Sequence, residues 1–491
     1  MEKNSILKAG RITEGVLVIL LSLMVGILSV NAGILAGRFV AVLLAGAAVA
    51  AVSCLFPDKK HFYLFLTVFF LPVNLNKALL KIDSSFLSVR DSITVSMPDV
   101  LLFILYCIWF YQMVHSREEG RKTVFFTFIS IPFFVMFSAG ILSFVNAGNT
   151  LYSTFGIFKL IKVFAYYFYA VNNIRSADDI KIILLGLLAG CGLQLSVAAL
   201  QLAAGKTLGL FYLGELSGEF RSWSGFHQVY RIGALLGHPN FFANYLDFMI
   251  PLMLSLSFLK ESVFVRRSAT ILFFGCITGM LFTLSRGGWA ASGTGAFIAF
   301  IMLAARNARE KCFLRKTFVL IIIVFCAGAA FSPKIIERVT SKDGGAANTR
   351  LEQIRVAENV IKEHPVCGIG LNNYSLVMED YDETYSKVSR SFKAPVHNAY
   401  LLVLAETGIL GFLGYIALYL SIFRHGFVNA GRSRGFLFNL NTGLLCGFIA
   451  NALHISIDLS LLNRLPYFLF LGGLFTVVDH SINKKIKLEG Y

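Results

Sequence analysis

The amino-acid sequence predicts an all-α polytopic membrane protein. Of its 491 residues, 56% are hydrophobic and 15% are charged, and the mean hydropathy is +0.70. A soluble domain carries about 25% charged residues. Apolar runs close to the about 20 residues that cross a bilayer as a helix recur along the whole chain. We therefore expect a single integral membrane domain over residues 1–491.

The apolar runs predict about twelve to fourteen transmembrane helices. The weakest are 61–76 and 465–479, which are short. Lys3, Lys8 and Arg11 precede the first run, and no small-residue cleavage site follows it, so we expect an uncleaved first span. The predicted spans are 13–30, 34–56, 61–76, 98–114, 124–145, 154–172, 181–203, 235–259, 268–285, 288–305, 317–333, 398–423, 436–456 and 465–479.

The basic residues predict the orientation of these spans. The formal net charge is +16, but most Lys and Arg residues fall in alternate short loops, so the charge does not indicate nucleic-acid binding. Basic loops stay in the cytoplasm, which predicts a cytoplasmic-membrane protein with both termini cytoplasmic. The basic groups lie at 59–60, 117–122, 175–181, 260–267, 306–316, 424–434 and 484–487.

Three longer loops then fall on the extracytoplasmic side, at about 77–97, 205–233 and 334–397. The last is the largest and contains a predicted amphipathic helix near 350–363. Thr349 can cap this helix, and Glu352 three residues later completes a capping box. We expect the helix to lie on the bundle or at the membrane surface.

Arg231, Arg286 and His397 all stand at the ends of spans on this same outer face. Cations are costly at membrane depth and are biased to the opposite side. An anionic substrate at the outer face would explain them. The alternative for Arg231 is a side chain that reaches toward lipid headgroups. The alternative for Arg286 is a lone arginine in a turn, without a ligand.

The first two arginines lie in sequences suited to binding anions. Arg231 precedes His238-Pro239-Asn240, where the proline fits the first turn of a helix, and free N–H groups at helix starts bind anions. His238 is more often structural. Arg286 occupies a very short turn, and Gly287 and Gly288 after it allow a ligand to approach the backbone closely. One guanidinium group can bind two phosphate oxygens at once.

The third sequence is His397-Asn398-Ala-Tyr400, followed by Glu406. Histidine can accept a proton from a hydroxyl near neutral pH. Glu406 lies about two turns into the predicted span, where an ionisable group is functional by default, although it can also be neutral and hydrogen-bonded within the bundle. Arg350 begins the predicted external helix and is a further ligand candidate.

Neither the cysteines nor the acidic residues predict a metal site. The eight cysteines have no zinc spacing or disulfide pattern. Asp380, Asp382 and Glu383 form an acidic group in the large loop, but two carboxylates two residues apart are weak evidence for a metal, and a solvated charge run is favoured. We predict no metal and no cofactor.

Taken in order, RIGALLGHPN, LSRGGW, TRLEQIRVAENVIKEHPVCGIGLNNY and HNAYLLVLAETGILG resemble the bacterial O-antigen ligase and O-antigen polymerase superfamily, over a region of about 231–415. The resemblance implies a GT-C-like helical enzyme that moves a glycan from undecaprenyl pyrophosphate to an acceptor hydroxyl, with inversion and without a metal. It also implies a catalytic set of Arg231, Arg286 and His397. Arg350, Asn398, Asn240, Glu406 and Tyr400 would bind substrate.

The resemblance does not separate a polymerase from a ligase. We favour a polymerase of a surface polysaccharide of exopolysaccharide, O-antigen or teichuronic acid type. A ligase, whose acceptor is a different lipid or a protein, is the alternative, and a flippase for lipid-linked glycans is the second alternative. The expected partners are the lipid-linked glycan, the acceptor glycan or lipid and the bilayer, and a chain-length regulator or flippase is a further candidate.

Overall fold

The computed structural model describes residues 53, 56–81, 92–115, 123–216, 218, 221–224, 227–311, 313–322, 332, 336, 346–459 and 465–483. The predicted span 13–30, nearly all of 34–56, the end of 317–333 and the residues Lys3, Lys8 and Arg11 lie outside these ranges. The chain divides into two compact units, residues 1–66 and 67–491. In the first unit the structure describes residue 53 and residues 56–66, which include the start of helix α3 (Lys59–Phe70).

Within the described ranges, eight helices are long and apolar enough to cross a membrane, which confirms the all-α polytopic class. Each matches a predicted span closely, except that α15 continues past the predicted end at residue 423. They are α4 (Met97–His115), α6 (Thr150–Asn173), α7 (Ala177–Ala204), α9 (Val263–Thr283), α10 (Arg286–Asn307), α15 (Ala399–Arg432), α16 (Gly435–His454) and α17 (Leu465–Ile482).

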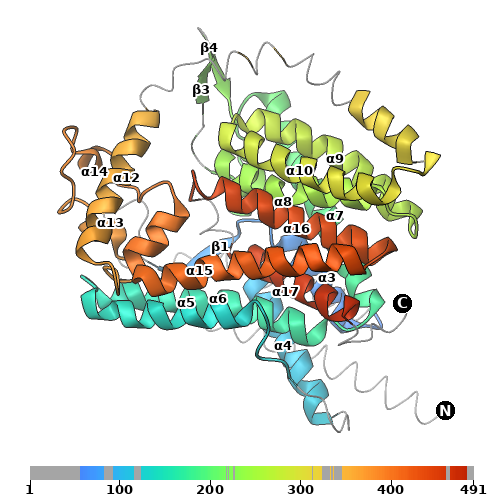
Figure 1. Cartoon of the computed structure of the whole chain (residues 1–491), viewed down its shortest axis with the longest axis horizontal. Coiled ribbons are helices and arrows are strands. Elements are labelled where there is room, and N and C mark those ends of the chain that lie inside the picture. Colours follow the sequence, from blue (N-terminus) through green and yellow to red (C-terminus); the bar gives the residue numbers. More distant parts are fainter. Residues whose placement is uncertain are drawn as a thin grey trace, which may run out of the picture. The chain divides into compact units, whose positions relative to one another are not determined.

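A ninth long helix, α8 (Pro239–Ser257), forms the centre of the packing in the second unit. It packs against α9, α10 and α16, and residues 242–257 are all buried. Figure 1 shows α8, α10 and α16 lying side by side. A helix that is covered on every side belongs to a core, so polar side chains on α8 must find partners inside the protein. The shorter α5 (Ser130–Leu142) and the 3-10 turn η1 (Ser143–Asn146) fill the predicted span 124–145, and α5 packs on α15.

The two shorter loops that were predicted to be external contain β-hairpins, which the sequence analysis did not predict. Strand β1 (Asn76–Lys81) pairs with β2 (Ser92–Ser96), and β3 (Arg221–Ser224) pairs with β4 (His227–Tyr230), both antiparallel. Two 3-10 turns, η2 (Phe211–Leu213) and η3 (Ala234–Leu236), complete the second loop.

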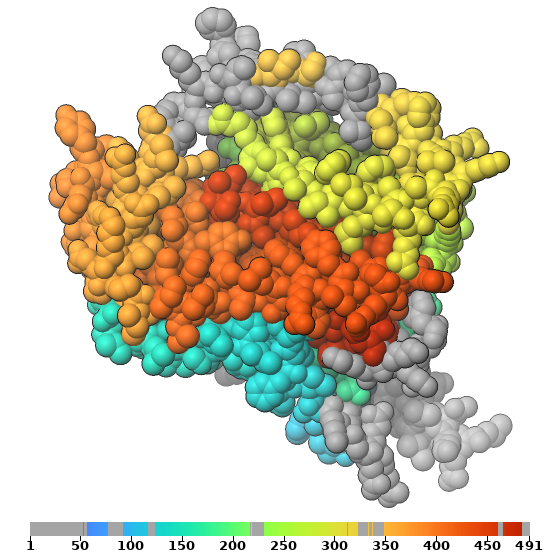
Figure 2. All heavy atoms as spheres, viewed as in Figure 1, coloured from blue at the N-terminus to red at the C-terminus, as the bar shows by residue number. Residues whose placement is uncertain are grey.

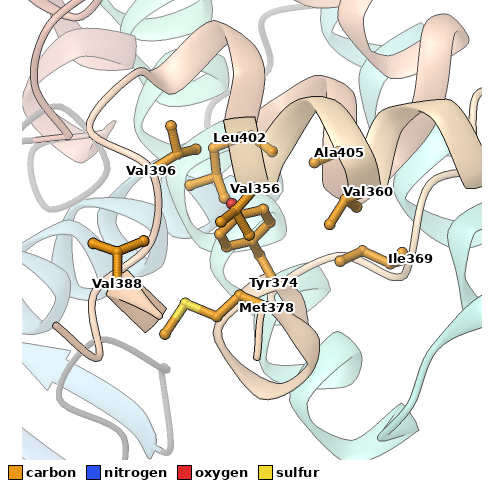
Figure 3. Close-up of a cluster of buried hydrophobic side chains, with 10 residues drawn as sticks. Val356, Val360, Ile369, Tyr374, Met378, Val388, Val396, Leu402 and Ala405 are labelled. Carbon is orange, nitrogen blue, oxygen red and sulfur yellow. The ribbon is translucent and has the colours of Figure 1, made fainter. Parts of the chain in front are cut away.

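The large loop folds around its own apolar core. It contains α12 (Ala346–Glu363), α13 (Tyr374–Val377) and α14 (Val388–Ser391). Figure 3 shows side chains from these elements meeting Leu402 and Ala405 of α15. In Figure 2 the light-orange surface of this segment adjoins the teal surface of α5 and η1, where Asn146 Nδ2 donates to Gly368 O at 2.9 Å. The predicted amphipathic helix is present, but it begins at Ala346, so the predicted cap at Thr349 is wrong.

Helix α15 is interrupted where the large loop meets it. Its 34 residues would extend about 50 Å, well beyond the about 30 Å hydrocarbon core of a bilayer. Gly408 breaks it, with φ 65° and ψ −169°. The segment before the break, Ala399–Thr407, belongs with the large loop, and the segment after it, 409–432, is long enough to cross the membrane alone.

Contacts between the described loop residues group at two ends of the second unit. At the end opposite the large loop, the contacts join Lys260 to Glu310 at 2.7 Å, Arg306 to Ala430 O at 2.9 Å, and Arg432 to Asn483 at 2.9 Å. At the end that carries the large loop, Asn149 N donates to Asn373 Oδ1 at 2.8 Å, Arg231 Nε to Thr283 O at 2.8 Å, and Ala399 N to Ile455 O at 2.9 Å.

Candidate active site

Arg231 links three segments that are far apart in the sequence. It follows β4, and its Nε donates to Thr283 O at the end of α9, at 2.8 Å. Its Nη2 donates to Asn240 Oδ1 in the first turn of α8, at 2.9 Å. Asn240 Nδ2 in turn donates to Asp458 Oδ2, just beyond α16, at 2.7 Å. The guanidinium is half-buried and held in one orientation by two hydrogen bonds.

His238 caps helix α8. Its Nδ1 accepts the N–H of Asn240 at 3.1 Å, and Pro239 occupies the first helical position, as predicted. The pKa of His238 is lowered from 6.5 to about 4, mainly by burial and also by the charges of Arg231 and His397, against the opposing effect of Asp458. His238 is therefore neutral at physiological pH. Asp458 belongs to the Arg231 network through its hydrogen bond with Asn240, and the charge of His397 acts on His238.

Arg286 begins helix α10 and is half-buried in the short turn between α9 and α10, as predicted. Ser285 caps the helix by accepting the N–H of Gly288 at 3.3 Å. A Cβ at Gly287 would lie 2.2 Å from Ile457 Cδ1 and 3.5 Å from His454 Cδ2. Side chains of the protein occupy the space that a Cβ at Gly287 would need, so this glycine serves close packing. Gly287 brings the start of α10 against the end of α16.

A buried acid–histidine pair lies beside this turn. Asp247 of α8 and His454 of α16 are 0–1% exposed, and Asp247 Oδ2 lies 2.6 Å from His454 Nδ1. The carboxylate and the ring are buried where α8, α10 and α16 pack together. Ionisable groups at membrane depth are costly unless they are paired. The pair therefore fixes the end of α16 against the middle of α8, beside the Arg286 turn.

His397 precedes α15 and contacts the large loop. Its Nδ1 lies 3.0 Å from Gln353 Oε1 on α12. An amide oxygen only accepts hydrogen bonds, so Nδ1 carries the proton and the neutral ring keeps a lone pair on Nε2. Burial lowers the pKa of His397, Asp458 opposes this, and Arg350 adds to it. Arg350, exposed on α12, is therefore part of the same charged group.

The other predicted substrate-binding residues have structural contacts. The Asn398 side chain caps α15 by accepting from Tyr400 N at 3.0 Å and from Leu401 N at 3.1 Å. Tyr400 Oη donates to Ala452 O at 2.9 Å. Glu406 Oε1 accepts from Tyr374 N at 3.3 Å, and Glu406 lies before the break in α15 rather than two turns into a span. These contacts indicate that Asn398, Tyr400 and Glu406 hold the backbone around the site in place.

Two carboxylates near the site were missed by the sequence reading. Asp458 is buried at 5% exposure and lies among Asn240, His238 and His397. Asp458 stands alone after a predicted span. The sequence could have indicated it, because it is an acidic residue on the same face as the three cations. Asp247 had a stronger one, an ionisable residue inside an apolar span.

The acidic group of the large loop is structural. Asp382 is buried, and its carboxylate accepts from Thr384 N at 2.9 Å and from Ser389 N at 2.7 Å. The favoured reading as a solvated charge run is therefore wrong for Asp382. In the described part of the chain, no group of three or more His, Cys, Asp or Glu side chains is placed to hold a metal ion.

Fold and site together define a multi-pass helical membrane protein with a cationic, histidine-containing site at the end that carries the large loop. Residues 271–416 match the O-antigen ligase family model, and this match supports membership in the O-antigen ligase and polymerase superfamily. No curated protein matches the chain. The matched region contains Arg286, Arg350 and His397, whereas Arg231, Asn240 and Asp458 lie outside it. The match supports an enzyme of the glycan-transferring ligase or polymerase type.

Proposed function

We propose that the protein polymerises a surface polysaccharide at the outer face of the cytoplasmic membrane, with an undecaprenyl-pyrophosphate-linked glycan as donor. The observation that carries this proposal is the network that joins Arg231 through Asn240 to the buried Asp458, whose charge, like that of Arg350, acts on His397. Arg286 begins α10 beside Gly287, which packs against Ile457, the residue before Asp458. Two of these arginines are fixed at the ends of apolar helices, where a diphosphate attached to a membrane lipid would arrive. Bidentate guanidinium groups suit phosphate oxygens.

In the proposed reaction His397 Nε2 removes the proton from the acceptor hydroxyl. The hydroxyl oxygen attacks the anomeric carbon of the donor from the face opposite the pyrophosphate, which inverts that centre. The bond from the anomeric carbon to the pyrophosphate oxygen breaks, and its electron pair leaves with undecaprenyl pyrophosphate. Arg231 and Arg286 stabilise the charge that develops on the leaving group, and such fixed charges have their largest effect where water is excluded. Arg350 assists on the donor.

Asn240, Asp458 and Gln353 act in this scheme as positioning residues. Asn240 orients the Arg231 guanidinium, and Gln353 fixes the tautomer of His397. Asp458 balances positive charge and favours the proton on His397 once it has been accepted, because an adjacent carboxylate stabilises the imidazolium.

The experiment that tests the function is to size the undecaprenyl-linked glycans of a strain that lacks the protein. Single repeat units on the lipid are expected for a lost polymerase, and a strain expressing His397→Ala should show the same products. Long polymer that stays on the lipid and never reaches its acceptor would identify a ligase. Repeat units confined to the cytoplasmic leaflet would identify a flippase and remove the assigned role of His397.

The rate of transfer should depend on pH through His397. Because the base must be neutral and its pKa is lowered from 6.5, kcat/KM should fall as the pH drops, with its midpoint below 6.5. The change Asp458→Asn removes the charge that raises this pKa, so the midpoint should move to lower pH still. A pH titration of purified wild-type protein and variant in nanodiscs measures both. A midpoint above pH 7, or one unmoved by the substitution, would rule out His397 as the base.

A further inference from the structure

A polar cavity lies next to the Arg231 site. It has a volume of about 290 Å³, close to the lower end of the ~300–1,000 Å³ range of small-molecule sites. One face of α6 forms a wall, with Phe155, Phe158, Lys159, Lys162 and Tyr166 at helical spacing. The β1–β2 hairpin and the starts of α4, α8 and α17 form the others.

The cavity and the site share structural elements. Phe241, in the first turn of α8, lines the cavity, and its ring centroid lies 5.2 Å from that of His238. Asn74, also in the lining, donates its N–H to Leu235 O at 3.2 Å, within the loop that carries Arg231 and His238. The ring of Phe241 therefore separates a ligand in the cavity from His238, which belongs to the Arg231 network.

The lining favours an anionic sugar. The described lining contains two lysines and no carboxylate. Lys162 Nζ uses two of its three donors, on Thr94 O and on Asp99 Oδ2, each at 3.0 Å, and Asp99 is not itself part of the lining. Lys159 adds a second ammonium group, so the described lining carries more positive than negative charge.

The other lining groups suit a pyranose ring. Aromatic side chains offer flat apolar surfaces to the C–H face of a sugar, and amides and hydroxyls match its hydroxyl rim. The lining provides both kinds, with Phe158, Phe241 and Tyr467 as rings and Asn74, Asn76 and Ser92 as polar partners. A phospholipid headgroup shares the anionic charge but lacks the ring and its hydroxyls.

We propose that this cavity binds one carboxylate-bearing sugar, a uronic acid, of the glycan substrate. The inference rests on the proposed function and deepens it, because it assigns an acidic glycan to this enzyme. The sugar would lie beside Lys159 and Phe158 and hold the rest of the glycan against the site near His238.

The experiment measures binding of digalacturonate to the full-length protein in phosphatidylcholine nanodiscs by calorimetry. Lys159→Gln should weaken binding at least tenfold, and Lys159→Arg, which keeps the charge, should stay within threefold of wild type. The neutral dimethyl ester of digalacturonate should bind at least tenfold more weakly than the acid. The matched control is Lys181→Gln, which changes an exposed lysine at the opposite end of the bundle.

Three outcomes would overturn the inference: no saturable binding of digalacturonate, equal binding by Lys159→Gln, or lysine-dependent binding of phosphatidylglycerol with none of the sugar. The transfer assay separates this inference from the proposed function. Binding that persists in His397→Ala while transfer stops supports both. Transfer without digalacturonate binding removes the cavity assignment alone, and lysine-dependent binding in a protein that transfers no glycan removes the proposed function alone.

Discussion

Replacing Arg231 by lysine should lower the rate of glycan transfer at least about 100-fold, as loss of one fixed charge-stabilising donor typically does. The arginine donates to Thr283 O at 2.8 Å and to Asn240 Oδ1 at 2.9 Å through two different nitrogens, and these two bonds fix the plane of the guanidinium. A lysine has one nitrogen on a flexible stem and cannot reproduce that planar arrangement. Because charge and length are nearly kept, the loss should appear in kcat rather than in folding.

The measurement is transfer from a purified lipid-linked repeat unit by the protein in nanodiscs, with the unfolding temperature recorded in parallel. Arg306→Lys is the matched control, since Arg306 also donates to a backbone carbonyl, Ala430 O at 2.9 Å, but at the other end of α10. It should keep the wild-type rate. If Arg231→Lys retained more than half of that rate, Arg231 could not be a ligand of the leaving group.

Hydropathy predicted the helices of this protein because each span must satisfy its own backbone hydrogen bonds in lipid. The positions of α4, α10 and α16 follow directly from that rule. The rule does not predict the structure of segments that lie outside the membrane. The strands of the β1–β2 and β3–β4 hairpins are only four to six residues long, too short for a period-2 pattern to stand out. The break in α15 depends on contacts with residues 365–370 that no local pattern encodes.

The candidate site was predictable in part for the same reason. Cations on the face that the sequence predicts to be external conflict with the usual charge bias, so Arg231, Arg286 and His397 stood out. Asn398 and Glu406 stood beside them in sequence, yet the structure uses their side chains to cap α15 and to hold the N–H of Tyr374. Asp458 and Gln353 act through pairing across the fold, and pairing between distant segments is not visible in one sequence.

Replacing Gly408 by alanine should separate the large loop from α15. At this position φ is 65°, and a Cβ would lie 2.0 Å from Val366 O and 2.8 Å from Cys367 N. The backbone there is strained for any side chain, at about 1–3 kcal/mol, before the overlap is counted. Since the obstacle is backbone on both sides, the loop must move away rather than a side chain rotate.

The break also pairs backbone groups that the interrupted helix leaves free. Ile369 N donates to Ala405 O at 3.0 Å, Gly370 N to Glu406 O at 3.1 Å, and Ile409 N to Pro365 O at 2.9 Å. Loss of the close approach at Gly408 would therefore expose several hydrogen-bonding groups at once. The loop carries α12, so Arg350 and Gln353 would move with it and His397 would lose its partner.

Hydrogen exchange of the protein in nanodiscs measures this directly. In Gly408→Ala the amides of Ile369 and Gly370 should lose their protection, and transfer should fall at least tenfold. Gly431→Ala is the control in the same helix, because a Cβ at Gly431 meets nothing within 4 Å and alanine favours a helix. Unchanged protection of Ile369 and Gly370 in Gly408→Ala would show that the loop is held by its apolar core alone. The ordered break in α15 would then have no part in placing His397.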